Sequence, residues 1–532
     1  MITHLIRLNL RLNRTMIIWW SLGLWAFLAL TPPAYLRYYP TLADREGLVD
    51  GMRDNMGTRA MYGIFPKPGT IGQFTTWETG AWMMVLAAAM AVLLITAMHR
   101  GAEAKGEAEL IQSAGLPRSK IILAALVASH LVALMVGVVS ILILIALHYL
   151  STDEISLEGA VTYGLMTTVI MSAFIGLTSI LQALWGNSIN LARLGLLAVA
   201  VSFLVRMFAD AYDAVSATVF NWISPLGWRA QIMPFTDDDW SALAIAAGIA
   251  VALTLIALAL DTRRSFNSSL IPQRASRERA PRRIRGLLSL NLLTHRGAVV
   301  AWSVTTGVII LSMLPLVDSL IPLIEQNDST LNVLQQLMPA EDLQSEFIVY
   351  IFQMVAVMVS VAVVQPLVTY VGQERIRLVD AMRAVGTPRW APLWGAVATA
   401  LLTGVACTVL GILGGFIALR LQDGEVVDGH ALVLASGGSM FLQTIIFTGI
   451  VTALAGWFPR ASHLAWLPVV TAGVVSILGP LFELTPEQID LSPLSHTATP
   501  SGDNLGTLAI FAGLGALGII LGLIGAQRRE IR

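Results

Sequence analysis

Long runs of residues without charge recur from one end of the chain to the other, and they constrain its fold more than any other feature. A helix needs about 20 apolar residues to cross the hydrocarbon core of a bilayer, which is about 30 Å thick. Only 13% of the residues are charged, against about 25% in typical soluble domains. The sequence therefore predicts an all-α polytopic membrane protein.

These runs predict about twelve transmembrane helices. Of these the fifth is the weakest prediction, because Arg206 interrupts it. The predicted spans are residues 16–34, 79–98, 121–147, 160–185, 194–209, 241–260, 298–316, 347–370, 390–419, 431–457, 464–482 and 505–525.

The charges between the spans indicate how the chain is oriented. Lysine and arginine are enriched in cytoplasmic segments of membrane proteins. With a cytoplasmic N-terminus, most of the 33 basic residues fall in inner segments. The outer segments collect acids instead, including Asp237, Asp238 and Asp428. We therefore expect both termini to be cytoplasmic.

The chain contains an internal repeat. A Leu-rich start before Trp20 resembles the segment before Trp302, and Ser224-Pro225-Leu226 matches Ser492-Pro493-Leu494. We predict two pseudo-equivalent six-helix halves, residues 1–260 and 284–532, joined by a basic cytoplasmic linker, residues 261–283. The linker arginines are expected to touch anionic lipid headgroups. We expect no nucleic-acid partner, because aromatic residues for base stacking are nearly absent beside them.

Shorter segments flank the spans. Residues 2–14 and 284–296 are amphipathic and predict an interfacial elbow helix at the start of each half. Residues 221–235 and 483–504 predict outer re-entrant helices, with Trp222 and Trp228 at headgroup level. The first outer loop, residues 35–77, is expected to cover the exit of a central path. The G-x-x-x-G spacings in residues 411–415 and 518–522 are interpreted as incidental.

A polar loop between the second and third spans is present in both halves. Glycine permits a bend where the span leaves the membrane, and the two acids point in different directions, because six residues turn a helix by about 600°. Gly-x-Pro-Arg then ends one helix and starts the next. The matched residues are Gly101, Glu103, Glu109, Gly115, Pro117 and Arg118 in the first half, and Gly372, Glu374, Asp380, Gly386, Pro388 and Arg389 in the second.

Two interpretations of these loops remain open. They are either solvated helical hairpins, or pairs of short helices presented to a cytoplasmic partner. Two equivalent elements in one chain imply a partner with two equivalent sockets.

Ionisable residues within predicted spans are the remaining candidates for a site. His130 lies in the third span, where we favour a neutral packing histidine over one that lines a cavity. Arg206 and Asp210 are four residues apart and are expected to pair on one helix face. We favour structural pairing over a gate.

The loop pattern resembles permease subunits of bacterial ATP-binding-cassette exporters, in particular those that export polyketide antibiotics. The resemblance spans nearly the whole chain, although residues 103–107 depart from the Glu-Glu and Gly-Arg that this family often carries. It implies a bacterial plasma-membrane protein whose two loops are coupling helices. These would dock into two copies of a cytoplasmic ATPase subunit.

The chain lacks the residues for hydrolysis itself. None of its lysines, Lys67, Lys105 and Lys120, stands in a G-x-x-x-x-G-K-[ST] phosphate loop. We therefore expect ATP and magnesium on a separate subunit, and no cofactor on this chain. The single cysteine, Cys407, excludes a disulfide or thiolate metal site within the chain. No metal site is predicted.

The predicted function is export of hydrophobic or amphipathic compounds, since the spans offer few fixed charges for polar solutes. One alternative is a proton-coupled secondary transporter, for which His130 is nearly alone as a titratable group within the spans. Another is a membrane enzyme such as a lipid-linked glycosyltransferase that uses Asp44, Glu46 and Asp50 of the first outer loop.

Overall fold

The long uncharged runs fold as helices, because a helix pairs its backbone polar groups internally. A computed structural model describes all residues except 1, 54–55, 153, 186–190, 212–214, 266–267, 272–283, 326–342, 385, 422–427, 480–483 and 530–532. Every element in the described part is helical, and eleven helices there are long and apolar enough to cross a membrane. The prediction of a polytopic all-α membrane protein is confirmed.

The chain divides into two compact units, Met1–Ser276 and Arg277–Arg532. Most of the predicted linker, residues 272–283, lies outside the described residues. The predicted domain boundaries therefore stay a prediction.

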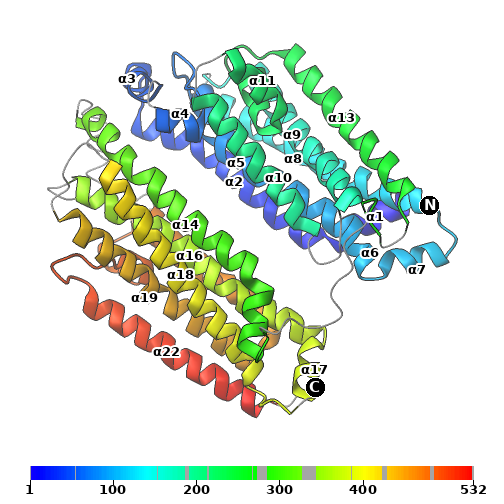
Figure 1. Cartoon of the computed structure of the whole chain (residues 1–532). Helices are drawn as coiled ribbons and strands as arrows, with labels where there is room; N and C mark the ends of the chain where they lie inside the picture. Colours follow the sequence, from blue (N-terminus) through cyan, green and yellow to red (C-terminus); the bar gives the residue numbers. More distant parts are fainter. Residues whose placement is uncertain are drawn as a thin grey trace. The chain divides into compact units, whose positions relative to one another are not determined.

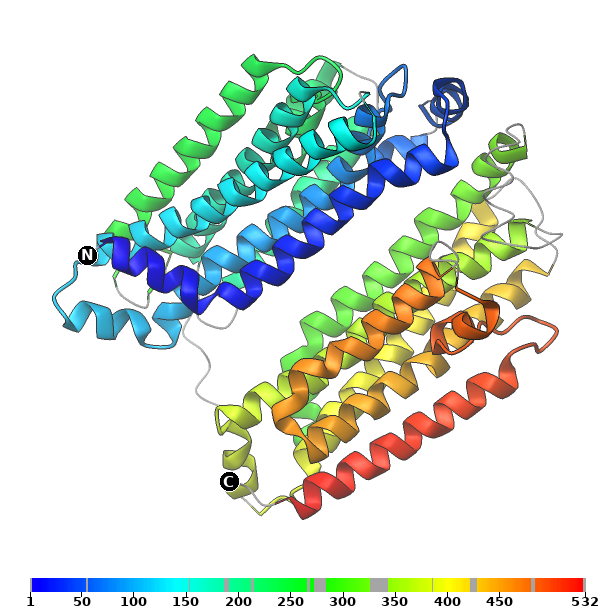
Figure 2. The same ribbon diagram turned by 180° about the vertical axis from the view of Figure 1, so that it is seen from behind.

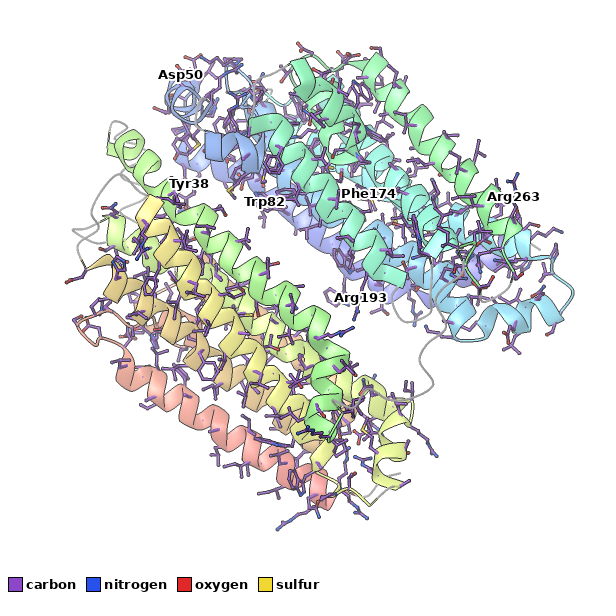
Figure 3. The ribbon with its side chains drawn as sticks, in the orientation of Figure 1. Tyr38, Asp50, Trp82, Phe174, Arg193 and Arg263 are labelled. Atoms are coloured by element: carbon purple, nitrogen blue, oxygen red, sulfur yellow. The ribbon has the colours of Figure 1, made fainter. Side chains whose placement is uncertain are left out.

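The first unit places its long helices side by side, with short helices at both ends (Figure 1). Figure 2 also shows α7 at the end that holds the N-terminus, and α3 at the opposite end. Arg193 and Arg263 lie at the α7 end, and Tyr38 and Asp50 lie at the α3 end (Figure 3). Its elements are α1 (Ile2–Leu12), α2 (Arg14–Tyr38), α3 (Leu42–Arg53), α4 (Met56–Tyr62), α5 (Ile71–Thr96), the π-helical turn η1 (Ala97–Gly101), α6 (Ala102–Ala104), α7 (Glu107–Ser113), α8 (Arg118–Leu150), α9 (Leu157–Trp185), α10 (Leu191–Ala211), α11 (Val215–Ile223), the 3₁₀ helix η2 (Pro225–Trp228), α12 (Arg229–Ile232) and α13 (Trp240–Arg263).

The second unit repeats this plan, with α17 at the end that holds the C-terminus (Figure 1). Its buried core is made of aliphatic and aromatic side chains such as Phe352, Val397 and Phe447. Its elements are α14 (Leu287–Glu325), α16 (Leu343–Arg375), α17 (Leu378–Ala384), α18 (Ala391–Leu421), α19 (Gly429–Trp457), the 3₁₀ helix η3 (Pro459–Trp466), α20 (Leu467–Leu478), α21 (Pro486–Ile489), the 3₁₀ helix η5 (Pro493–Ser495) and α22 (Leu505–Arg528).

Glycines bring α19 and α22 together along their length. A Cβ added to Gly449 would overlap the carbonyl oxygen of Gly515, and one added to Gly456 would overlap that of Gly522. The later glycine of α19 contacts the later glycine of α22, so the two helices run parallel. The interpretation of the G-x-x-x-G spacing as incidental is wrong here, because Gly518 also packs against the backbone of Gly449.

The parallel packing explains how the eleventh predicted span is built. Within that span, residues 464–482, lies α20, which has 12 residues and a length of about 18 Å. It is too short to cross about 30 Å of hydrocarbon by itself. However, α22 runs parallel to α19, so the chain must travel to the other end of the unit between them, through η3 and α20. The count of twelve spans stays a prediction.

Two smaller predictions are wrong. The expected elbow of the second half is not a separate helix, since its residues from Leu287 onward continue into α14, whereas Asn13 leaves the regular helix between α1 and α2. Trp228 does not face headgroups, because it is 1% exposed and donates to the carbonyl of Trp222 at 3.0 Å.

Candidate functional site

The two polar loops predicted to be equivalent have the same backbone fold. Their short helices, α7 and α17, contain seven residues each and occupy matching positions. Before them, the amide of Gly106 donates to Glu103 and that of Arg377 donates to Glu374, both at 3.0 Å. After them, Gly115 and Gly386 have φ of +86° and +85°, the left-handed conformation of a glycine that ends a helix.

Each loop turns beyond the glycine at which a bend was predicted. Gly101 has helical dihedral angles in the π-helical turn, and Gly372 lies within α16. The chain turns instead at Gly106 and Arg377, whose φ values are +76° and +60°. Gly101 and Gly372 are right-handed helical and do not form this turn, and their predicted role in a bend where the span leaves the membrane stays a prediction.

Glu103 ties the first loop to the segment that follows the last helix of its half. Its carboxylate accepts bonds at 2.8 and 2.6 Å from the guanidinium of Arg264, and another at 2.7 Å from Arg100. Arg264 also donates from Nε to Asp261 at 2.5 Å. Burial by itself lowers the pKa of Arg264, but the hydrogen bonds and charges of these acids raise that pKa above the usual arginine value.

Glu374 makes the corresponding tie in the second half. Its Oε1 accepts from Arg383 of α17 at 2.8 Å and from Arg529, which follows α22. Burial lowers the pKa of Arg383, but its hydrogen bond to Glu374 together with the charges around it, including those of Glu374 and Asp380, raises that pKa overall. In both halves, therefore, the first acid of the loop binds an arginine placed directly after the last long helix.

The other loop residues lie nearer the surface. Glu109 is exposed on α7, and Asp380 is half-buried beside Arg383 at 3.4 Å. Arg118 and Arg389 differ, since Arg118 donates to the carbonyl of Arg264 whereas Arg389 is exposed. The prolines of both loops precede the next long helix, and the carbonyls of Pro117 and Pro388 accept from Lys120 and Ala391 at 3.0 Å.

A second polar cluster lies at the opposite end of the first unit. Arg206 and Asp210 pair at 3.8 Å and are both buried. Asn221 donates to the other oxygen of Asp210 at 3.0 Å. Arg206 also donates to the carbonyl of Ala60 in α4 at 3.1 Å, so this pair fastens the first loop of this end to α10.

Arg229 completes this cluster and was not predicted. It donates to the carbonyl of Trp77 at 2.9 Å, and burial lowers its pKa, an effect that the charge of Asp210 opposes. With Asp210 and Asn221 it lines a cavity of about 530 Å³. The preference for structural pairing of Arg206 and Asp210 over a gate stays a prediction.

His130 packs between helices and does not line this cavity. Its Nδ1 donates to the carbonyl of Leu126 at 2.8 Å, and its Nε2 lies 3.1 Å from the hydroxyl of Thr254 on α13. Both ring nitrogens therefore have partners, which is the arrangement of a packing histidine.

The arginines that bind the loop acids were not predicted from the sequence. Arg264 and Arg529 each follow the last predicted span of a half, so the repeat itself contained the signal. Arg529 was assigned no role, and Arg264 was expected to touch lipid headgroups as part of the linker, which is wrong because Arg264 is buried. Their partners are far away in the sequence, Glu103 by 161 residues and Glu374 by 155 residues.

Apolar helices in two similar sets, long enough to cross a bilayer, make this a polytopic membrane protein. The sequence profile of the family described as "Multidrug efflux system permease Rv1217c, C-terminal domain" matches residues 3–260 and 284–527. The chain belongs to this multidrug efflux permease family. It is also 24% identical to the multidrug efflux system permease protein Rv1217c of Mycobacterium tuberculosis (strain ATCC 25618 / H37Rv), over 99% of this chain and 95% of that protein.

Proposed function

We propose that this chain is the permease subunit of an ATP-driven exporter, and that it moves hydrophobic or amphipathic drug-like compounds with energy from a separate ATPase. The observation that carries this proposal is the repeated loop, which has one fold in two places and is tied in each half to the end of the last long helix. A solvated hairpin needs no such tie.

The ties supply a route from the loops to the spans. A partner that moves α7 pulls on α13 through Glu103 and Arg264, and a partner that moves α17 pulls on α22 through Glu374 and Arg529. Packed helices respond to such displacements as rigid elements with discrete arrangements. Two copies of an ATPase that close on ATP would thus move both halves together.

A proton-coupled transporter remains the second candidate. It needs titratable groups along the path, and His130 is engaged in packing on both sides of its ring. Transport that continues when the proton gradient is collapsed and ATP is supplied supports the exporter. Transport that stops under these conditions supports the second candidate.

The docking role of the loops is tested by charging their exposed apolar residues. Leu110 of α7 is 73% exposed and Leu378 of α17 is 50% exposed. We expect the double variant Leu110→Asp and Leu378→Asp to lose ATP-dependent drug uptake into inverted vesicles that contain the cognate ATPase, by at least about tenfold, because about 1.4 kcal/mol of lost docking energy suffices for that factor.

The matched control charges two leucines of equal or greater exposure away from these loops. Leu150 is 85% exposed at the far end of α8, and Leu491 is 77% exposed between α21 and η5. Their double aspartate variant should retain uptake. Drug uptake by the purified chain in vesicles without any ATPase would show that the proposed function is wrong.

A further inference from the structure

A basic pocket in the second unit lies beside the loop that the proposed function uses and shares Glu374 and Arg529 with it. Its volume is about 560 Å³, and it lies where α16 and α19 end and where the chain leaves α22. Its lining residues are Glu374, Arg375, Arg377, Asp380, Trp457, Phe458, Pro459, Arg460, Ala461 and Arg529.

Positive charge dominates this pocket. Four arginines and two carboxylates line it. Glu374 is held by Arg529 of the lining and by Arg383, which lies outside the lining and also holds Asp380. Arg375 donates to the carbonyls of Pro459 and Arg460 at 3.3 and 3.4 Å, which fixes the start of η3 beside the end of α16. Guanidinium groups in a fixed arrangement bind phosphate through two parallel hydrogen bonds.

One edge of the pocket is aromatic and apolar. Trp457 and Phe458 are both exposed at the end of α19. The indole of Trp457 is fixed in place, because its Nε1 donates to the carbonyl of Leu521 on α22 at 2.8 Å. Exposed tryptophan at the end of a membrane-spanning helix is typical of the headgroup level, where its ring contacts both acyl chains and water.

We propose that this pocket binds the phosphate headgroup of an anionic phospholipid. The arginines supply the recognition of phosphate, and the aromatic edge supplies a surface for the start of the acyl chains. A basic pocket between helix ends is suited to such a headgroup. The aromatic edge favours a lipid over a soluble phosphate, which would leave Phe458 exposed to water.

The first half lacks two of the arginines of this pocket. At the positions that match Arg375 and Arg377, the first half has Ala104 and Gly106, so the repeat is broken where the phosphate would bind. We therefore expect one tightly retained lipid per chain.

Native mass spectrometry of the full-length chain in detergent tests this site, with phosphatidylglycerol and phosphatidylcholine offered at equal concentration. We expect the wild-type chain to retain phosphatidylglycerol at least about threefold more than phosphatidylcholine. The double variant Arg377→Gln and Arg460→Gln should lose this preference. The double variant Arg193→Gln and Arg263→Gln removes the same charge from exposed positions of the first unit and should keep it.

Two further arms make the outcome decisive. Inorganic phosphate offered alone at the same concentration should not be retained, and its retention at one per chain would reassign the site to a soluble phosphate. If the glutamine variant unfolds at a lower temperature than wild type, the double variant Arg377→Lys and Arg460→Lys replaces it. The lysine variant keeps the positive charge but loses the paired donors of the guanidinium groups. We expect it to retain an intermediate amount of lipid. Equal retention of both lipids by the wild-type chain would overturn the proposal, as would an unchanged preference in the glutamine variant.

Discussion

Glu103 is buried between two arginine side chains, so we expect its charge to contribute to stability. Replacing it with glutamine leaves Arg100 and Arg264 without their shared acid. We expect Glu103→Gln to lower the free energy of unfolding by about 3 kcal/mol, the typical cost of removing one partner of a buried pair. Thermal unfolding of the purified chain in detergent measures this change.

The control at this scale is Glu109→Gln, because Glu109 is exposed on the same loop. A change at such a position usually alters stability by no more than about 0.5 kcal/mol. The prediction fails if the two variants melt at the same temperature. The prediction that the two acids of each loop point in different directions holds in the first loop, where Glu103 is buried and Glu109 is exposed. It is wrong in the second loop, where Glu374 and Asp380 both bind Arg383. The arginine partners were not predicted, because they reach these acids only through tertiary packing.

Close helix packing in the second unit depends on particular glycines. A Cβ at Gly522 would overlap the backbone of Thr452, whereas one at Gly513 on the same helix meets nothing. We expect Gly522→Val to separate α22 from α19 and to cost about 2 kcal/mol, the typical penalty of overpacking. Gly513→Val adds the same side chain to α22 without that overlap. Thermal unfolding of both variants should show a much smaller loss of stability for Gly513→Val.

Equal melting temperatures for the two glycine variants would show that α19 and α22 do not pack through these positions. At the scale of elements, the sequence predicted the long helices well, because apolar composition alone requires them in a membrane. It did not predict the short α20 or the unbroken start of α14. Both features depend on what each segment packs against. The contact of Gly518 does too, because G-x-x-x-G spacing alone does not show whether a glycine packs against another helix.

The whole molecule is predicted to place both loops on one side of the membrane, since the two halves are predicted to have the same orientation. The repeat and the distribution of arginine indicated this arrangement. The structure adds that each loop lies at the end of its unit where the last long helix finishes, through Arg264 and Arg529. How the halves combine to form a path was not predicted, because the repeat specifies each half and not the packing between them.

Cysteine accessibility tests this orientation. Cys407 is buried, so a Cys407→Ala background should retain the fold. In that background, Glu109→Cys and Asp380→Cys should react with a membrane-impermeant maleimide only in inverted vesicles. Asp50→Cys and Asp503→Cys, at exposed positions predicted to lie outside, should react only in intact cells. If positions 109 and 380 react from opposite sides, the halves are inverted relative to each other, and one ATPase pair cannot contact both loops.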